Sequence, residues 1–446
     1  MRNVRYIEFI GLDDETKKSM TDNPDSVTGW AIQQPFDEND SSYEATDGTD
    51  AATLMNRLYE LSKYTIQATN QDVFVDSQAR ERAPYEGDLL VNSNTSYSVS
   101  DNYSLARHSN EWLMDNETWP NDYRIFSVEM TYWDYLYTGN IDSLRENYNA
   151  LKRKLTAEVE YEDAATGLIR ANGSQAGNSA IIDWPTSERD GYQSSYYDVV
   201  FNAEYVGIYL DMAVLSEALG ETADAQYYTQ KSEKLKESLL KYAYDEQNGC
   251  FYDSLDQNYN ATKHSSTHAT AYALCYGVFD SQSMADDMCE FVYNQCKEEF
   301  KGSVYVTYFI LKGLYNGNHG EYAEKLMTNP KVGENVKTFA SLLDDLHCTI
   351  TPEAWGHKWK GNMTMSHPWG AAPGCSIVQG TFGILPTKAG FEEFDIKIQP
   401  GDIASAEVKA PTVKGAVEVS YSDADKENAL VADVTIPANT KAKVLY

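Results

Sequence analysis

The sequence predicts a helical domain built from consecutive hairpins, followed by a small antiparallel β domain. Apolar residues recur at helical spacing from about residue 50 to residue 385, and glycine-containing turns separate the helical segments. After residue 385 the pattern changes to period two, which is typical of strands. Roughly ten to twelve helices fit in the helical region, a number that suits either an open superhelix or a closed ring of hairpins. Long, aromatic-rich loops at one set of helix ends favour the closed ring with a pocket.

Residues 1–49 precede the first helical pattern. The run from Val4 to Ile10 alternates as a strand does, and the polar stretch that follows is rich in Asn and Asp. This run has no partner strand nearby in the sequence, so we interpret residues 1–49 as the strand remnant of an upstream β domain and a linker.

The first helix is expected directly after the capping candidates Thr49 and Asp50. Its repeating inward positions are Leu54, Leu58, Leu61 and Thr65. Another clear helix is expected behind Ser143-x-x-Glu146, which matches a capping box. The repeating positions of this helix are Leu144, Tyr148, Leu151, Leu155 and Val159.

Short turns join the predicted helices into hairpins. They are Thr138-Gly139-Asn140, Leu219-Gly220-Glu221 and Asn316-Gly317-Asn318, in which glycine supplies the left-handed conformation that often ends a helix. We therefore assign residues 50–385 to one helical domain.

Residues 386–446 form the predicted β domain. Period-two segments begin at Phe394, Ala416, Leu430 and Ala442, and Pro, Gly, Asn and Asp turns separate them. This spacing predicts a small antiparallel β-sandwich.

The composition excludes several classes of partner. The 446 residues contain 68 acidic and 36 basic side chains, giving a formal net charge of -32 that repels nucleic acid and anionic membranes. No apolar run approaches the roughly 18 residues of a membrane span. The N-terminus lacks the apolar core of a secretory signal, so we expect a cytoplasmic protein or one from which a signal was removed.

No metal or cofactor site is expected. The six cysteines lack the close pairing of zinc or redox motifs and are interpreted as buried free thiols. His264 and His268 lie four residues apart, but no acidic third ligand follows at a recognisable spacing, so we expect solvent or barrel-interior roles. No phosphate-binding loop, Ser-His-Asp arrangement or calcium loop is recognisable.

The segment from Asp76 to Asp88 is the strongest candidate for a functional site. It contains four carboxylates, two arginines and a tyrosine, and Pro84 and Gly87 interrupt the period of a solvated helix face. These side chains are expected to converge from a loop, where binding and catalytic groups are usually displayed. A salt-bridged structural loop is the alternative.

This segment resembles the acidic motif of glycoside hydrolase family 78, the α-L-rhamnosidases, in which an Asp, an Arg-Glu-Arg and a Gly-Asp stand at this spacing. The resemblance extends from about residue 50 to the C-terminus. The further matching motifs are Asp183-Trp184-Pro185, Thr351-Pro-Glu353-Ala-Trp355, Ser366-His367-Pro-Trp369-Gly-Ala-Ala-Pro, Phe382-Gly-Ile-Leu-Pro386 with Gly390-Phe391, and Ile436-Pro-Ala-Asn-Thr.

The resemblance implies an all-α (α/α)6 barrel of helical hairpins followed by a β-sandwich. It also implies an inverting exo-glycosidase that cleaves terminal α-L-rhamnosides, with Glu81 at the position of the general acid and Glu353 at that of the general base. Inversion needs two carboxyl groups roughly 6.5–9.5 Å apart, with space for a water molecule. Residues so distant in sequence can meet in this way only if the chain closes back on itself.

Further residues match positions where the family binds sugar or complete a plausible pocket lining, and Tyr85 stands where relatives often have Trp. These expected substrate-binding residues are Asp76, Arg80, Tyr85, Asp88, Trp119, Asp122, Asp183, Trp184, Trp355, His367 and Trp369. The expected partner is a rhamnose-containing glycoside or oligosaccharide, without cofactor.

Alternatives stay open at this stage, both for single residues and for the whole chain. Taken singly, Asp183 could cap a helix and Trp184 could belong to the core. The whole chain could instead be another six-hairpin glycosidase or a phosphorylase, or a noncatalytic sugar-binding barrel that lost its upstream domains.

Overall fold

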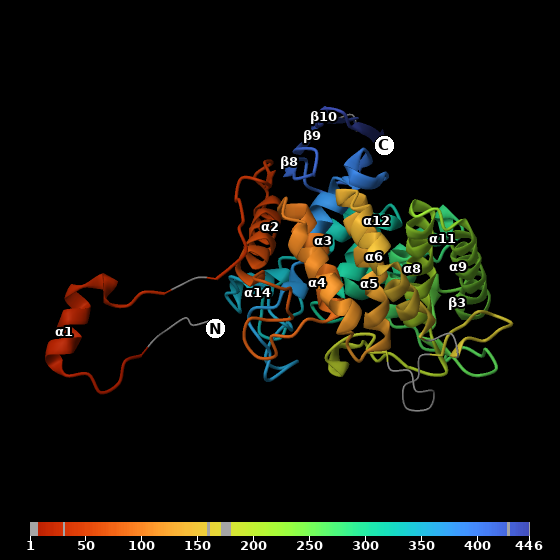
Figure 1. Ribbon diagram of the computed structural model, residues 1–446, viewed down its shortest axis with the longest axis horizontal. Coiled ribbons are helices and arrows are strands. Elements are labelled where there is room, and N and C mark those ends of the chain that lie inside the picture. Colours follow the sequence, from red (N-terminus) through yellow and green to blue (C-terminus); the bar gives the residue numbers. More distant parts are fainter. Residues whose placement is uncertain (1–7, 30–31, 158–160, 171–179, 426–428, 446) are drawn as a thin grey trace.

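The computed structural model describes residues 8–29, 32–157, 161–170, 180–425 and 429–445. A helical body is followed by sheets at one end of the molecule, and α1 (Asp14–Asp22) lies apart from the body without burying a side chain (Figure 1). Of the expected strand at Val4 to Ile10, residues 4–7 lie outside the described residues, and residues 8–10 are not in a strand.

The inner layer of the helical body is a closed ring. It contains α3 (Glu86–Val99), α5 (Asn121–Thr138), α8 (Val199–Ala218), α10 (Thr267–Cys275), α12 (Thr307–Asn316) and α15 (Ala372–Cys375), which η5 (Ser376–Thr381) continues. Each inner helix packs against the next in this order, and α15 packs against α3. Every residue of α3 and α10 is buried, as expected for helices enclosed on all sides.

The outer layer alternates with the inner layer along the chain. It contains α2 (Asp50–Thr69), α4 (Ser104–Asp115), α6 (Ile141–Thr156), α9 (Thr222–Ala243), α11 (Gln282–Cys296) and α13 (Gly320–Met327). Each outer helix packs against an inner helix beside it in sequence. Because the layers alternate, the inner helices all begin at the same end of the ring, and their N-termini surround one opening.

Shorter elements lie in the connections. They are α14 (Phe339–Asp344), the turns η1 (Pro24–Ser26), η3 (Thr186–Glu188), η4 (Pro368–Gly370) and η6 (Ala389–Phe391), and the two-residue strands β2 (Tyr197–Asp198), β3 (Tyr244–Asp245), β4 (Cys250–Phe251) and β5 (Ser254–Leu255). β2 pairs with β5 and β3 with β4, both antiparallel.

The caps of two helices test the sequence prediction directly. At α2 the prediction is confirmed: the Thr49 side chain accepts a hydrogen bond from the Ala52 N–H at 3.1 Å. At α6 the predicted capping box is wrong, because Asn140 is the N-cap and its side chain accepts from the N–H of Asp142 and Ser143. The Ser143 hydroxyl donates to Glu111 of α4 instead, and the expected position Val159 lies outside the described residues.

The predicted hairpin turns form, but in one of them the left-handed residue is not the glycine. Gly139 and Gly220 adopt positive φ values of 73° and 79°. In the third turn Gly317 has φ −77°, and the next residue, Asn318, adopts the left-handed conformation at 67°. Asparagine tolerates this region better than most residues, so the turn closes one position later.

The C-terminal region forms two sheets. The four-stranded sheet has the order β1-β8-β9-β10 and the three-stranded sheet the order β11-β7-β6. Their strands are β1 (Ser42–Ala45), β6 (Leu385–Pro386), β7 (Glu393–Lys397), β8 (Ser405–Ala410), β9 (Val417–Asp425), β10 (Ala429–Thr435) and β11 (Lys441–Leu445). The predicted antiparallel pairing is wrong for β11, which runs parallel to β7.

Strand β1 was not predicted, and it comes from the other end of the chain. It precedes α2 and pairs antiparallel with β8, from Ser42 opposite Lys409 to Ala45 opposite Ala406. Tyr43 and Ala45 are buried, while Ser42 and Glu44 are exposed. Four residues give too short an alternation to stand out in a polar stretch, so only the pairing partner reveals the strand.

Helix α8 is the one described helix long and apolar enough to cross a membrane by length and composition alone. Within its most apolar window, 72% of the residues are buried inside the structure. Its place in the inner layer, between α5 and α10, accounts for this apolar composition.

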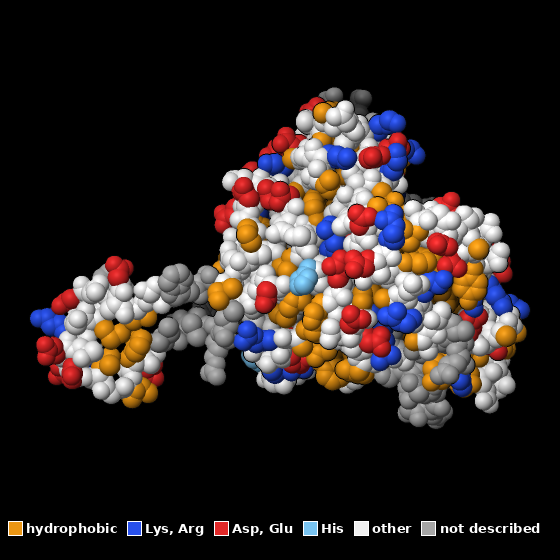
Figure 2. Space-filling view, in the orientation of Figure 1, with side chains coloured by type: hydrophobic (Ala, Val, Ile, Leu, Met, Phe, Trp, Pro, Cys, Tyr) orange, Lys and Arg blue, Asp and Glu red, His pale blue; other side chains and the backbone are white. Residues whose placement is uncertain are grey.

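Charged side chains of both signs are interspersed on the face shown in Figure 2.

The six cysteines are buried and form no disulfide, as the sequence predicts.

The ring closes where α15 packs against α3 and α2, and we call this contact the seam. Small polar residues form it. The Thr95 hydroxyl of α3 donates to the Ala371 carbonyl at 3.1 Å, and the Gly374 N–H donates to Ser62 Oγ of α2 at 3.2 Å. A Cβ atom on Gly374 would lie 2.8 Å from Ser62 Cβ and 2.9 Å from Thr95 Cγ2. The three helices therefore approach as closely as a glycine allows.

We predict that Gly374→Ala lowers the free energy of unfolding by about 1–3 kcal/mol through overpacking at this seam. The loss should appear although alanine normally favours a helix over glycine. Urea denaturation measures it, with Gly361→Ala as the control, because a Cβ there meets only a carbonyl oxygen at 4.0 Å. A Gly374→Ala variant as stable as the parent protein would contradict the prediction.

Candidate active site

A cavity of about 200 Å³ lies at the end of the ring where the inner helices begin. It is lined by Asp76, Glu81, Tyr85, Asp88, Trp119, Pro120, Tyr123, Ile181, Trp184, Glu353, His367 and Trp369. The lining therefore combines carboxylates, an imidazole and aromatic rings. Its residues come from the connections before α3, α5 and α15, from the first turns of α3 and α5, and from the loops around residues 181 and 353.

The loop before α3 closes on itself at Asp76 and Ala83. The Asp76 N–H donates to the Ala83 carbonyl at 2.9 Å, and the Ala83 N–H donates to Asp76 Oδ1 at 2.9 Å. Between these two residues Arg82 adopts a left-handed φ of 55°, which makes the turn tight. This closed loop presents Arg80 and Glu81 to the cavity side, and Pro84 then leads into α3.

Gly87, in the first turn of α3, permits close packing against α5. A Cβ atom there would lie 2.5 Å from the ring of Tyr123, which lines the cavity. The neighbouring Glu86 does not join the cavity. Its buried carboxylate pairs with Lys154 of α6 at 2.9 Å and accepts from the Thr118 hydroxyl, so it anchors the segment that contains Trp119.

Arg80 joins the two glutamates. Its Nη1 forms an ion pair with Glu81 Oε1, and its Nη2 lies 2.8 Å from Glu353 Oε1. The Tyr85 hydroxyl donates to the other oxygen of Glu81 at 2.9 Å. Residues 81 and 353 thus meet across one guanidinium, as ring closure requires. Glu81 has 36% of its side chain exposed and Glu353 only 3%.

Glu353 is held on both carboxylate oxygens. Oε2 accepts from the Thr364 N–H at 2.8 Å and from the Thr364 hydroxyl at 3.3 Å. Oε1 faces Arg80 and also lies 3.4 Å from Lys360 Nζ. In addition, the Trp369 indole N–H donates to the Glu353 carbonyl at 3.1 Å. The orientation of this carboxylate is therefore fixed from four directions.

His367 lies between two buried carboxyl groups without a short hydrogen bond to either. Nε2 is 3.8 Å from Asp76 Oδ2, and Nδ1 is 3.5 Å from Asp88 Oδ1. Burial lowers the pKa of His367 well below its usual value, and the charges of Arg80 and Lys360 lower it further. The imidazole is therefore neutral at neutral pH.

The same burial raises the pKa of the two aspartates. Desolvation raises the pKa of Asp76 to about 6, against the hydrogen bond from Ala83 that favours its ionised form. Desolvation raises the pKa of Asp88 well above its usual value, and the nearby Asp76, Glu81 and Glu353 raise it further.

Aromatic side chains form the rim and floor of the cavity. Trp119 and Trp184 are 60% and 40% exposed, which is unusual for tryptophan and leaves their rings accessible at the opening. Trp369 is buried and packs against His367, with ring centroids 4.2 Å apart. Tyr85 contributes its hydroxyl to Glu81 as well as its ring.

Four expected sugar-binding residues are not among the residues that line the cavity: Arg80, Asp122, Asp183 and Trp355. Arg80 nevertheless contacts both glutamates of the lining. Trp355 is buried in the core, stacked on Phe300, and donates to the Gly302 carbonyl. Asp122 accepts the N–H groups of Ile181 and Ile182 at 2.8 and 2.9 Å. Asp122 therefore fixes the backbone behind the cavity.

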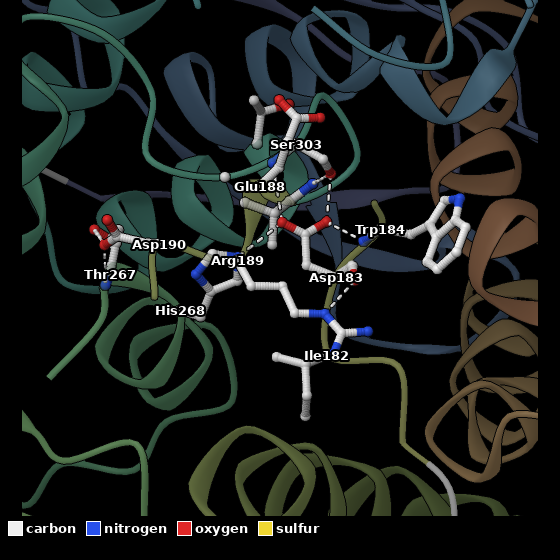
Figure 3. Close-up of polar contacts among 12 residues, drawn as sticks. Ile182, Asp183, Trp184, Glu188, Arg189, Asp190, Thr267, His268 and Ser303 are labelled. Atoms are coloured by element: carbon white, nitrogen blue, oxygen red, sulfur yellow. Dashed lines mark hydrogen bonds and ion pairs between the residues drawn. The ribbon is translucent and has the colours of Figure 1, made fainter. Parts of the chain in front are cut away.

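Asp183 anchors the loop that contains Trp184 (Figure 3). Its carboxylate accepts from the Ser303 N–H at 2.9 Å and from the Ser303 hydroxyl, and contacts His268 Nε2 at 2.8 Å. Figure 3 shows the Trp184 ring directed away from this cluster. His268 is thus an interior side chain bound to Asp183, while His264 contacts Asp253.

Several lining residues were not predicted from the sequence. Pro120, Tyr123 and Ile181 are cavity-wall residues next to predicted ones, and Thr364 and Lys360 contact Glu353. Proximity to Trp119, Asp122 and Asp183 in sequence was the available signal for the first three. Among the described residues, no group of three His, Cys, Asp or Glu side chains has the arrangement of a metal site.

The raised pKa of Asp76 predicts a pH dependence of stability. A carboxyl whose pKa rises from 3.8 to about 6 on folding stabilises the folded state at low pH, and this contribution is lost as pH increases. Relative to Asp76→Asn, the parent protein should lose about 2 kcal/mol of unfolding free energy between pH 4 and pH 7. Urea denaturation across this range measures the difference, and parallel profiles would contradict it.

Two protein-family models match this chain. Residues 49–374 match the family model described as the bacterial alpha-L-rhamnosidase 6 hairpin glycosidase domain, and residues 383–445 match the bacterial alpha-L-rhamnosidase C-terminal domain. No curated protein sequence matches this chain.

Solved structures show the same fold at low sequence identity. A family GH78 rhamnosidase of Bacillus sp. GL1 is 18% identical with a TM-score of 0.75, over 92% of this chain and 44% of that one. An alpha-L-rhamnosidase of Streptomyces avermitilis, complexed with L-rhamnose, is 17% identical with a TM-score of 0.71, over 92% and 38%. A Klebsiella oxytoca rhamnosidase with rhamnose bound is 16% identical with a TM-score of 0.59, over 76% and 66%.

The chain spans less than half the length of the first two of these relatives. The matches confirm the predicted fold class, a six-hairpin barrel followed by a C-terminal β domain. Since the first family model alone covers most of the sequence, this chain belongs to the bacterial α-L-rhamnosidase family, a group of glycoside hydrolases.

Proposed function

We propose that this chain hydrolyses terminal α-L-rhamnosides with inversion at the anomeric carbon, with Glu81 as general acid and Glu353 as general base. The observation that carries the proposal is that both carboxyl groups line one cavity and contact the same guanidinium. Inversion requires about 6.5–9.5 Å between the two groups so that a water molecule fits. The inverting assignment follows from the resemblance of these two glutamates to the acid and base of the family.

Glu353 has the surroundings of a base. The side chains of Arg80 and Thr364 donate to its carboxylate, and Lys360 forms an ion pair with it; an ionised carboxylate is the form that suits such surroundings. Its orientation is therefore fixed before substrate binds. In that position it would take a proton from the attacking water.

Glu81 has the surroundings of an acid at the mouth of the cavity. It is more exposed than Glu353, which suits a group that must reach the glycosidic oxygen of a departing aglycone. A general acid must hold a proton when the glycoside binds, whereas Glu81 forms an ion pair with Arg80 in this structure. We therefore expect sugar binding to draw Arg80 away from Glu81 toward a sugar hydroxyl.

The polar lining suits a neutral, hydroxylated ring. Asp76 Oδ2, Asp88 Oδ1 and His367 Nδ1 are buried and make no hydrogen bond to the described residues. Unpaired buried polar atoms are costly, and sugar hydroxyls would pair with them. The several carboxyl groups disfavour an anionic sugar.

The apolar lining suits a deoxy sugar. The rings of Trp119 and Trp184 offer faces for stacking, and Pro120 and Ile181 give an apolar wall for the methyl group of a 6-deoxyhexose. Two relatives with this fold are described with rhamnose bound. A rhamnose-containing glycoside or oligosaccharide is therefore the proposed substrate.

We predict that Glu81→Gln and Glu353→Gln each lower kcat for an aryl α-L-rhamnoside by about 10²–10⁴-fold, the range for loss of general acid or base catalysis. Glu117→Gln is the matched control, because Glu117 lies outside the cavity with 48% of its side chain exposed. The loss in Glu81→Gln should shrink with a better leaving group, such as 2,4-dinitrophenolate, which needs less protonation. The loss in Glu353→Gln should not.

Near-normal turnover in both glutamine variants would overturn the assignment of acid and base. If the parent protein binds rhamnose in calorimetry yet hydrolyses no rhamnoside, a noncatalytic sugar-binding barrel is the correct description.

A separate prediction concerns stereochemistry. Proton NMR in the first minutes of hydrolysis should show β-L-rhamnose as the initial product, before mutarotation produces the α anomer, because water attacks from the face opposite the leaving group. Initial release of the α anomer would indicate a retaining mechanism and would exclude Glu353 as the base for direct attack by water.

A further inference from the structure

Lys360 lies where two loops of the cavity meet. Its Nζ is 3.4 Å from Glu353 Oε1 and 5.1 Å from the centroid of the Trp184 ring. Only 10% of its side chain is exposed. One largely buried cation thus contacts both the carboxylate assigned as base and the tryptophan at the rim.

The physical chemistry of lysine makes these two contacts interdependent. A buried ammonium group has three donors and no acceptor, so it requires anionic or π-electron partners. Glu353 supplies the negative charge and Trp184 supplies the ring face, an attraction of about 0.5–2 kcal/mol depending on desolvation. The position of the Trp184 ring is therefore coupled to the charge on Glu353.

Backbone hydrogen bonds fix where Lys360 stands. The Lys360 N–H donates to the Gly356 carbonyl at 3.3 Å, and the Met363 N–H donates to the Lys360 carbonyl at 3.1 Å. The Glu353 N–H donates to the Thr364 carbonyl at 2.9 Å and closes the loop. Lys360 is thus presented by the loop that also presents the base.

A second lysine joins the same two loops farther from the cavity. Lys337 Nζ lies 4.1 Å from the Trp359 ring centroid and 3.2 Å from Glu188 Oε1. Glu188 belongs to the loop of Trp184, and Trp359 precedes Lys360. The loop of Trp184 and the loop of Glu353 are therefore joined at two points. At each point a lysine lies between a tryptophan and a glutamate.

We propose that Lys360 is a positioning residue for the hydrolysis. Lys360 holds the Glu353 carboxylate in place and keeps the Trp184 ring against the bound sugar. This inference rests on the proposed function. No sequence motif pointed to Lys360, and its role follows from the two contacts alone.

The proposal has a signature in the pH profile. Arg80 and Lys360 are the cations that face Glu353, and Glu81, Asp88 and His367 are the other titratable groups around it. Lys360 is one of the charges that lower the pKa of His367, so removing its charge favours a proton on that imidazole. The acidic limb of kcat/KM should therefore move to higher pH in a variant without this charge.

The experiment compares three variants with 4-nitrophenyl α-L-rhamnoside as substrate. Lys360→Met should lower kcat/KM by about 10–100-fold, the range for misplaced catalytic groups, raise KM through Trp184, and shift the acidic limb upward by about one pH unit. Lys360→Arg should restore the position of the acidic limb. Lys358→Met is the matched control, because Lys358 lies 4.8 Å from the Trp359 ring on the same loop, and it should behave as the parent protein.

Two outcomes would overturn the proposal while leaving the proposed function intact. One is a Lys360→Met variant with parental kcat/KM and acidic limb. The other is an equal loss in Lys360→Met and Lys358→Met, which would mean that loop charge alone matters. If Lys360→Met fails to fold, Trp184→Leu serves instead: it should raise KM and leave the acidic limb in place, and a shifted limb would contradict the proposed division of roles.

Failure of the proposed function is recognised separately, by a parent protein that hydrolyses no rhamnoside. In that case calorimetry with L-rhamnose tests Lys360, since loss of the Trp184 contact should weaken binding about tenfold or more relative to Lys358→Met. Equal affinities would overturn the inference.

Discussion

Closure of the helical ring is the constraint on which the cavity depends. Residues 76–88 lie before the second helix of the barrel and residues 353–369 before its last one, so they meet only where α15 packs on α3. The seam relies on close approach at Gly374 and on hydroxyl groups of α2 and α3. The Thr351 N–H also donates to Thr65 Oγ1 at 3.0 Å, which ties the loop before Glu353 directly to α2. The seam therefore determines the spacing of the two glutamates.

The parallel arrangement of the inner helices explains the chemistry at one end of the ring. Helix N-termini present unpaired N–H groups and partial positive charge, which favour carboxylates nearby. Asp88 and Asp122 lie in the first turns of α3 and α5. Burial opposes this effect and raises the pKa of both, that of Asp122 to about 6. Of the two, Asp88 retains a buried oxygen, Oδ1, without a hydrogen bond to the described residues, whereas Asp122 binds the backbone of Ile181 and Ile182.

Sequence alone predicted the parts of the fold that depend on local pattern. The period of α2, its Thr49 cap and most C-terminal strands follow from neighbours in sequence. The cap of α6 was misplaced because Asn140 and Ser143 are both good capping residues, and the preceding Gly139 turn decides between them. Strand β1 was missed because its partner lies over 350 residues away.

The sequence indicated most residue types of the site, but not which of these side chains face the cavity. The dense Asp76–Asp88 segment and the Glu353 and His367 motifs were recognisable, and their side chains share one cavity. Asp183 and Trp355 have the same residue types as cavity residues but face the core, and no local pattern separates the two cases. Lys360 could not be singled out because a lysine in a loop is ordinarily solvated, and only the tertiary contacts show it to be enclosed.

The pairing of β1 with β8 has a consequence for how the chain can be divided. A segment that precedes the first barrel helix supplies an edge strand to the terminal sheet, and Asn56 of α2 binds the backbone of Ala45 at its end. During synthesis this strand must wait for most of the polypeptide before its partner exists. A fragment that retains the C-terminal strands but lacks residues 42–45 would leave β8 as an unpaired edge strand. The helical body and the terminal sheet are therefore better regarded as one cooperative unit joined by β1.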